Sequence, residues 1–249
     1  MANSRSGDSM TERIVRVIDT FTSDRTMQTA AEIARRAELP ASSAHRIVGD
    51  LVTAGLLERD EDGRIRLGMR LWELALRGSS ALRLRQAALP HMESAQAIIR
   101  EHTQLAVLEH DEALFLERLS HPDAGANITR IAGRLPVHAS SSGLVLLAFA
   151  DPSIRERILA APLRALSRET VTDATALRSL LASVRRRGYV VAQGSIESVS
   201  TGVAVPVRDR GEVVAALSAV LPRDAASAPT VDVLLAAATA IEQDLRTMR

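Results

Sequence analysis

The first part of the chain carries apolar residues at helical spacing in three short stretches. Their recurrence every three or four positions predicts helices over residues 11–21, 29–37 and 41–54. Two short strands are predicted next, over residues 56–59 and 64–67, because the acidic turn between them ends in glycine, as in β-hairpins. Three helices followed by a hairpin is the order of a winged helix-turn-helix, a fold that typically binds DNA.

The remainder of the chain shows a mixed pattern of helices and strands. One connecting helix is predicted over residues 68–88, and a second helix, over residues 91–102, is expected to open after Pro90. Further helices are predicted over residues 142–149, 153–160, 175–187 and 230–249. Strands are predicted over residues 104–109, 113–119, 128–131, 189–192, 203–207 and 213–220. This order predicts three parts: a winged domain over residues 1–67, a linker helix over residues 68–88 and an α/β domain over residues 89–249.

The absence of cysteine narrows the chemistry that the chain can perform. It excludes disulfide bonds, thiolate metal sites and cysteine nucleophiles, and it fits a reducing cytoplasm. The first nine residues contain no apolar segment, so no signal peptide is predicted, and the longest apolar runs are too short to span a bilayer. We therefore expect a cytoplasmic protein with no membrane partner.

Charge gives no separate support for DNA binding. The formal net charge is +1, and residues 1–70 contain equal numbers of arginine and acidic residues, so this region lacks the positive charge typical of nucleic-acid-binding domains. The hypothesis of DNA binding must therefore rest on where individual side chains lie.

The third predicted helix has the geometry to read a major groove. Its apolar stripe centres on Ala44, Ile47 and Leu51, so that Ser42 and Arg46 point away from the core. Arginine pairs with guanine through two hydrogen bonds, and serine hydroxyls bond phosphate or base edges. The same pattern also fits a solvated face or a module that binds protein. The candidate DNA-binding residues are Thr29, Ser42, Ser43, His45, Arg46, Arg64 and Arg66.

A serine run, Ser140, Ser141 and Ser142, stands before Gly143 at the start of a predicted helix. Free N–H groups at a helix start hold carboxylates, and the three hydroxyls add donors. An equally simple interpretation is an N-cap made of small residues. If this region does bind a carboxylate, the low aromatic content of the chain favours aliphatic walls around it.

Enzyme function is the competing class, and the sequence motifs do not favour it. His138 lies beside the serine run, but the chain has no G-x-S-x-G elbow, no paired-carboxylate motif, no H-E-x-x-H and no glycine-rich nucleotide loop. Metal binding by His110 and His121 is a minor alternative. We therefore expect no catalytic residue, no cofactor and no metal. A C-terminal domain that binds protein and no ligand is a third possibility.

Several blocks of residues resemble the IclR-type transcriptional regulators. The resemblance extends from about Glu12 to Pro222, and the order and spacing of the blocks make it specific. Residues 31–46 resemble the family's helix-turn-helix, residues 55–68 its wing, and residues 133–143 the most distinctive block of its effector domain; residues 187–189 and 203–207 match two more blocks. Four departures stand out. Glu38 replaces the usual glycine of the turn, and Leu144 follows Gly143 where lysine is usual. Gly202 occupies a place where many members carry a pocket cysteine, and residues 195–201 depart from the acidic sequence common before that strand.

The resemblance implies a two-domain α+β fold, with an N-terminal winged helix-turn-helix, a linker helix and a C-terminal GAF-like α/β domain built on an antiparallel sheet. It also implies a repressor or activator that binds double-stranded operator DNA as a homodimer or homotetramer. A small effector, which we expect to be a carboxylate, would bind the C-terminal domain. Together with the serine run, the family positions give the expected effector site as Leu135, His138, Ser140, Ser141, Ser142, Gly143, Gly202, Val203 and Ser218.

Overall fold

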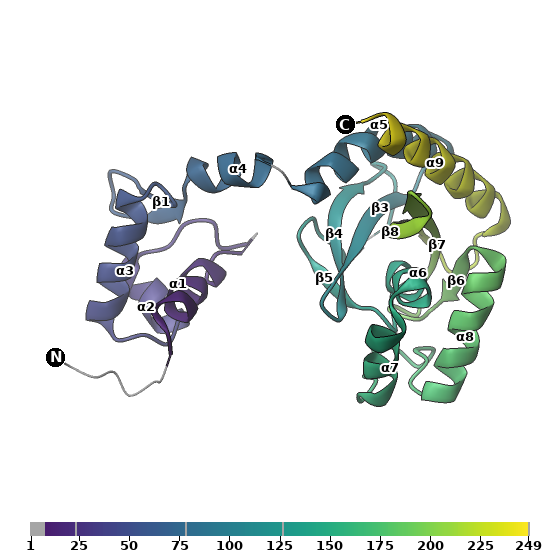
Figure 1. Cartoon of the computed structure of the whole chain (residues 1–249), viewed down its shortest axis with the longest axis horizontal. Helices are drawn as coiled ribbons and strands as arrows, with labels where there is room; N and C mark the ends of the chain where they lie inside the picture. Colours follow the sequence, from purple (N-terminus) through teal and green to yellow (C-terminus); the bar gives the residue numbers. More distant parts are fainter. Residues whose placement is uncertain (1–7, 23, 78, 126, 249) are drawn as a thin grey trace. The chain divides into compact units, whose positions relative to one another are not determined.

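The protein is described here by a computed structural model that covers residues 8–22, 24–77, 79–125 and 127–248 (Figure 1). The chain separates into two compact units, one ending at Ser79 and the other beginning at Ser80. The first unit holds helices and one hairpin, whereas the second is built on an antiparallel sheet. The predicted two-domain α+β class is confirmed.

The first unit follows the order of a winged helix-turn-helix. Its elements are α1 (Met10–Asp19), α2 (Ala30–Arg36), α3 (Ala41–Thr53), β1 (Leu57–Arg59), β2 (Ile65–Leu67) and α4 (Met69–Leu76). The hairpin strands pair antiparallel, and Ile33, Ile47 and Leu57 are fully buried between the helices and the hairpin. Ser9 and Thr29 open α1 and α2 with capping boxes, which satisfy backbone N–H groups that a helix start leaves unpaired.

The turn between α2 and α3 requires a left-handed backbone. Glu38 adopts a φ of 52° there, which is a conformation that favours glycine. The glycine that the resemblance leads us to expect at this position would adopt such a φ without strain. In this chain the turn forms with a glutamate, whose backbone N–H bonds the carbonyl of Arg35.

The linker is not the single helix that was predicted. The structure has α4, which ends at Leu76, and α5 (Ser80–Ile99), which continues through Pro90. Residue 78, part of the predicted linker helix, lies outside the described residues. Pro90 is exposed, so the carbonyl that loses its helical N–H partner lies on the solvent side of α5. On its other side α5 buries Ala88 and Met92 against the sheet, and this packing outweighs the missing hydrogen bond.

The second unit has a sheet of six strands in the order β5-β4-β3-β8-β7-β6, and every neighbouring pair is antiparallel. The strands are β3 (His102–Glu109), β4 (Glu112–Leu119), β5 (Arg134–Pro136), β6 (Val190–Gln193), β7 (Ser200–Asp209) and β8 (Glu212–Pro222). The helices after α5 are α6 (Ser141–Phe149), α7 (Pro152–Ala160), α8 (Ala174–Arg187) and α9 (Ala228–Thr247).

The two faces of the sheet carry separate cores. Helices α5 and α9 cover one face, and α6, α7 and α8 lie on the other (Figure 1). Successive residues of a strand point to opposite faces, so Val203 and Val205 pack toward α5 and α9, whereas Ala204 packs toward α6. The expected effector site includes the serine run, which begins α6 and lies on the α6 face.

The strand predicted over residues 128–131 is wrong. These residues form a loop, and the third strand of this region is β5, which starts at Arg134. Ile128 and Ile131 are about half exposed, so their alternation does not mark a buried strand face. Thr129 between them is buried, and its hydroxyl accepts a hydrogen bond from Gln104 Nε2 at 2.6 Å. A polar anchor, and not an apolar one, therefore holds this segment to the sheet.

Candidate functional site

Helix α3 presents most of the predicted DNA-binding residues on one exposed face. Ser42, His45 and Arg46 are exposed and Ser43 is half-buried, whereas Ile47 lies in the core. The helix starts after Pro40 with no side-chain cap, so its first N–H groups are available to a phosphate. The structure thus brings four of the predicted residues together at the start of one helix.

The ion pair that Arg46 forms within α3 is weak. Its guanidinium lies 3.5 Å from the carboxylate of Asp50 one turn later, and both side chains are more than half exposed. Exposed ion pairs of this kind contribute little to stability, because water and salt screen them. Arg46 can therefore leave Asp50 for a base or a phosphate at small cost.

The remaining predicted DNA contacts lie where the hairpin meets the start of α2. The backbones of Gln28 and Ile65 exchange two hydrogen bonds, which brings Thr29 close to the wing residues Arg64 and Arg66. All three predicted residues are exposed. Two of them already have structural partners, since the Thr29 hydroxyl caps α2 and Arg66 pairs with Glu58 across the hairpin.

Glu58 links the wing to α4. Its Oε1 accepts a hydrogen bond from the backbone N–H of Met69, with an N–O distance of 3.0 Å. Its Oε2 accepts one from Nε of Arg66, also at 3.0 Å. These two donors hold the pKa of Glu58 below its usual value, the Met69 N–H having the larger effect. Because Gly68 has no side chain to cap α4, Glu58 supplies the acceptor from the hairpin.

A small, partly open cavity lies on the α6 face of the second unit. Its apolar walls are mainly aliphatic, as expected, with Phe115 as the aromatic member. The residues that line it are Gln104, Phe115, Asn127, Ile128, Thr129, Leu135, Ala139, Ser140, Ser141, Ser142, Ala192, Ser195, Ile196, Glu197, Ser200, Gly202 and Val220.

The three serines at the start of α6 do different things. Ser140 is the N-cap, and its hydroxyl accepts the N–H of Gly143 at 3.0 Å. The Ser142 hydroxyl donates to Ser218 at 2.8 Å beneath the cavity. Ser141 faces Gly202 so closely that a Cβ added to Gly202 would lie 2.6 Å from Ser141 Oγ. Among the described residues, no hydrogen bond holds the Ser141 hydroxyl, which leaves it for a ligand.

A buried polar chain extends from α6 across the floor of the cavity. Ser218 continues the chain from Ser142 by donating to Gln104 Oε1 at 3.5 Å, and Gln104 Nε2 donates to Thr129 Oγ1. Thr129 in turn donates to Asn127 Oδ1 at 2.8 Å. Within the part of the chain that the structure describes, the buried Nδ2 of Asn127 has no partner. This nitrogen is therefore a free donor at the cavity.

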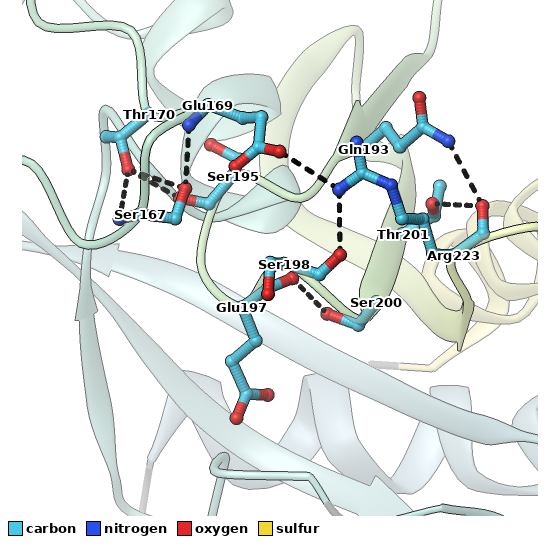
Figure 2. A network of polar contacts seen from close by, with 10 residues as sticks. All are labelled: Ser167, Glu169, Thr170, Gln193, Ser195, Glu197, Ser198, Ser200, Thr201 and Arg223. Atoms are coloured by element: carbon cyan, nitrogen blue, oxygen red, sulfur yellow. Dashed lines mark hydrogen bonds and ion pairs between the residues drawn. The ribbon is translucent and has the colours of Figure 1, made fainter.

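The segment of residues 195–200 forms one wall of the cavity, and Figure 2 shows how it is held. The guanidinium of Arg223 donates to the carbonyl of Ser198 at 2.7 Å and to Glu169 Oε1 at 3.1 Å. The Thr170 hydroxyl donates to the carbonyl of Ser195, whose own hydroxyl donates to Ala139 O at 2.8 Å. The wall is therefore anchored both to the loop before α8 and to the start of α6.

Four of the nine expected effector residues do not line the cavity. Val203 points to the opposite face of the sheet, because its neighbour Gly202 points into the cavity. The Nε2 of His138 lies 2.9 Å from the carbonyl of Arg164, so this histidine is held within the fold. Gly143 packs against the backbone of Val137, with no room for a Cβ. Ser218 is fully buried beneath the cavity floor. The other five, namely Leu135, Ser140, Ser141, Ser142 and Gly202, line it.

The cavity also contains residues that sequence reasoning missed. Gln104 is a polar residue in an apolar predicted strand, and that contrast was an available signal. Residues 195–201 stood out only as a departure from the family pattern, which did not place Ser195 and Glu197 in the site, because long-range hydrogen bonds fold their segment over the sheet. Leu135 was expected from family position alone, and the structure places it in the wall.

Metal-ion sites and membrane-spanning helices are both absent from the described residues. In these segments no group of three or more acidic or histidine side chains gathers that could hold a metal ion. His110 and His121, the weaker metal candidates, each lie beside an acidic neighbour, Glu109 and Asp123. No helix of the described segments is long and apolar enough to cross a bilayer.

Comparison with known proteins identifies both units. The family described as "Bacterial transcriptional regulator IclR C-terminal" matches residues 78–246, and the "IclR helix-turn-helix domain" matches residues 11–61. The HTH-type transcriptional regulator XynR of Escherichia coli is 31% identical over 214 residues, which is 83% of either chain. The Pca regulon regulatory protein of Pseudomonas putida is 30% identical over 206 residues, covering 81% of this chain and 70% of its own length.

A solved structure of similar sequence covers nearly the whole chain. It is an IclR homologue from Microbacterium hydrocarbonoxydans complexed with 4-hydroxybenzoate, which is 63% identical to this chain with a TM-score of 0.93. The match covers 96% of this chain and 100% of that protein. The chain belongs to the IclR family of bacterial transcriptional regulators.

Proposed function

We propose that this regulator binds an aromatic carboxylate in the cavity of its second unit and that this effector changes the affinity of its first unit for operator DNA. The observation that carries the proposal is the start of α6 in the cavity wall. The first N–H groups of a helix have no acceptor within the helix. At the start of α6, the hydroxyl of Ser140 accepts the N–H of Gly143, so the N–H groups of Ser141 and Ser142 remain for an anion.

The choice of an aromatic acid rests on the cavity and on a relative. The apolar walls, which include Phe115, Leu135 and Val220, would contact the ring of such an acid. The Microbacterium hydrocarbonoxydans homologue, 63% identical to this chain, was solved with 4-hydroxybenzoate. A benzoate whose carboxylate bonds the start of α6 would use Ser141, Ser142 and the polar floor. Ser140, Gly143 and Ser218 act indirectly in this arrangement, by holding α6 in place.

DNA recognition is assigned to α3 and the wing. Ser42, Ser43, His45 and Arg46 would enter the major groove, with the uncapped start of α3 against a phosphate. Thr29, Arg64 and Arg66 would contact the adjoining backbone, because they gather where the hairpin meets α2. Since this unit carries no excess positive charge, a single copy would bind weakly, and specific binding requires two copies on two half-sites.

A homodimer is supported by the surface of α4. Met69, Trp72 and Leu76 lie on one side of this helix, and all three are more than 40% exposed. An eight-residue helix is too short to be stable in water by itself. Packing the same side of α4 from a second copy against it would bury these side chains and place two winged domains side by side.

We further propose that the protein acts in the cytoplasm and catalyses no reaction on its effector. Its relatives XynR and the Pca regulon protein are named as regulators. The cavity combines one helix start with hydroxyls, amides and the carboxylate of Glu197, and no histidine is among the described residues that line it. Bound effector should therefore be recovered unchanged after prolonged incubation with the protein.

The proposed function is tested by binding 4-hydroxybenzoate to the full chain and to Ser141→Leu. The ligand should raise the melting temperature of the unaltered protein, and the leucine, which would fill the space between α6 and Gly202, should abolish that rise. Ser153→Leu, a serine outside the cavity at the start of α7, is the matched control and should keep it. Equal stabilisation of all three proteins would refute the assignment of the cavity.

A further inference from the structure

The cavity wall contains a single ionisable side chain, that of Glu197, among the described residues that line it. Within these residues its carboxylate has neither a hydrogen bond nor an ion pair; the two bonds from Ser200 go to the backbone carbonyl of Glu197. A partly buried carboxylate without a partner is unfavourable unless a donor reaches it. Glu197 is therefore a candidate acceptor for a group on the ligand.

The nearby cation does not neutralise Glu197. Arg223 is the arginine that holds this segment, but its guanidinium bonds Glu169 and the carbonyl of Ser198. Figure 2 shows the side chain of Glu197 directed away from Arg223. The two side chains of the ion pair between Arg223 and Glu169 lie close to Gly194. If residue 194 carried a Cβ, that atom would lie 2.6 Å from a guanidinium nitrogen of Arg223 and 3.0 Å from Cδ of Glu169. This ion pair therefore packs against the backbone of Gly194. Because Arg223 is engaged there, it does not pair with Glu197, which lines the cavity.

The position of Glu197 suits one end of a bifunctional ligand. Ser195 is fixed beside the start of α6 by its bond to Ala139 O, and Glu197 follows two residues later. Two residues of extended chain span about 7 Å at most, which is comparable to the length of a substituted benzoate. A ligand whose carboxylate lies at the start of α6 can therefore reach Glu197 with its other end.

We propose that Glu197 determines effector specificity by accepting a hydrogen bond from a hydroxyl or amino group at the end of the effector opposite its carboxylate. The inference rests on the proposed function and adds a ligand class to it. Hydrogen bonds to an ionised acceptor are stronger than neutral ones, so a benzoate with such a donor is favoured over benzoate. A second carboxylate at the same end would be repelled by the charge of Glu197, so dicarboxylates should bind more weakly than benzoate.

The test measures the affinity of three probes for the full chain by calorimetry: benzoate, 4-hydroxybenzoate and benzene-1,4-dicarboxylate. The unaltered protein should bind 4-hydroxybenzoate about tenfold or more tightly than benzoate, because a charge-assisted hydrogen bond is gained. It should bind the dicarboxylate more weakly than benzoate. In Glu197→Leu both differences should disappear. Glu197→Gln should keep part of the preference for the hydroxyl and lose the discrimination against the dicarboxylate.

Glu212→Gln is the control, since this exposed glutamate lies at the start of β8 away from the cavity lining, and it should behave as the unaltered protein does. Melting temperatures without ligand show whether each variant folds. If Glu197→Leu retains both affinity ratios, the specificity role of Glu197 is wrong while the proposed function stands. If none of the probes binds the unaltered protein, the aromatic effector class and the role of Glu197 both fail.

Discussion

Gly202 on β7 and Ser141 on α6 approach each other so closely that any side chain at residue 202 would displace the serine. A Cβ at residue 202 would lie 2.6 Å from Ser141 Oγ and 2.9 Å from Ser141 Cβ. Such distances are far below van der Waals contact, so either α6 or its serine would have to move. The glycine thereby keeps the hydroxyl of Ser141 and the free N–H groups of α6 open to a ligand.

Gly202→Ala should weaken effector binding without unfolding the protein. Overpacking a well-packed site typically costs about 1–3 kcal/mol, which corresponds to a loss of roughly 5- to 150-fold in affinity for 4-hydroxybenzoate. Calorimetry measures this change directly. Gly125→Ala is the matched control, because a Cβ there meets no atom within 4 Å. Unchanged affinity in Gly202→Ala would show that the ligand does not use this part of the cavity.

Arg46→Ala should weaken operator binding. Loss of a base contact costs about 1–3 kcal/mol and relaxes sequence preference at one position, whereas loss of a phosphate contact lowers the salt dependence instead. Gel shifts at several salt concentrations distinguish the two roles. Arg178→Ala, an exposed arginine of α8 that pairs with Glu156, should bind DNA as the unaltered protein does. If Arg46→Ala retains full affinity and preference, α3 does not read the operator.

Leu76→Asp should shift the protein from dimer to monomer. The aspartate would place a charge on the side of α4 that also carries Met69 and Trp72, where a second copy is proposed to pack. Sedimentation velocity measures the change, and Trp72, the chain's single tryptophan, should show red-shifted emission when it becomes exposed. Leu74→Asp places the same charge on the opposite side of α4 and should remain dimeric; dissociation of both variants alike would contradict the assigned face.

Glu58→Ala should loosen the start of α4. Without the carboxylate, the N–H of Met69 loses its acceptor, so its hydrogen exchange should become faster, whereas Glu58→Gln retains an acceptor oxygen and should protect it better. Because the folded pKa of Glu58 is lowered, its contribution is complete above the unfolded value and is lost as pH falls through the folded one. Equal protection of Met69 in Glu58→Ala and the unaltered protein would show that Glu58 does not cap α4.

Local pattern was sufficient to predict most elements of the fold. Helices α1 to α3 and the strands β3, β4, β7 and β8 have strong periodicity or long apolar runs, and their predicted bounds agree within a few residues. The errors arose where tertiary packing overrides local signals. Pro90 is tolerated within α5 because its face is exposed, and the loop of residues 128–131 is held by the bond from Gln104 to Thr129, which no local pattern contains.

The candidate site was only half predictable for the same reason. The serine run marks a helix start within the chain itself, and strand alternation decides that Gly202 and not Val203 faces α6 once the sheet is known. Glu197 has no such signal, because its place in the wall depends on Arg223 and Thr170, which are far from it in the sequence. Residues positioned by long-range hydrogen bonds require the structure.

Effector control of DNA binding is tested most directly by measuring operator affinity with and without effector. The operator fragment is obtained by sequencing genomic DNA that the protein retains, and fluorescence anisotropy gives its Kd for the full chain. Saturating 4-hydroxybenzoate should change this Kd by about fivefold or more, as is typical of allosteric coupling. Ser141→Leu should bind the operator equally well and show no such change. An identical Kd with and without effector, under conditions where calorimetry shows the effector bound, would contradict effector control of DNA binding.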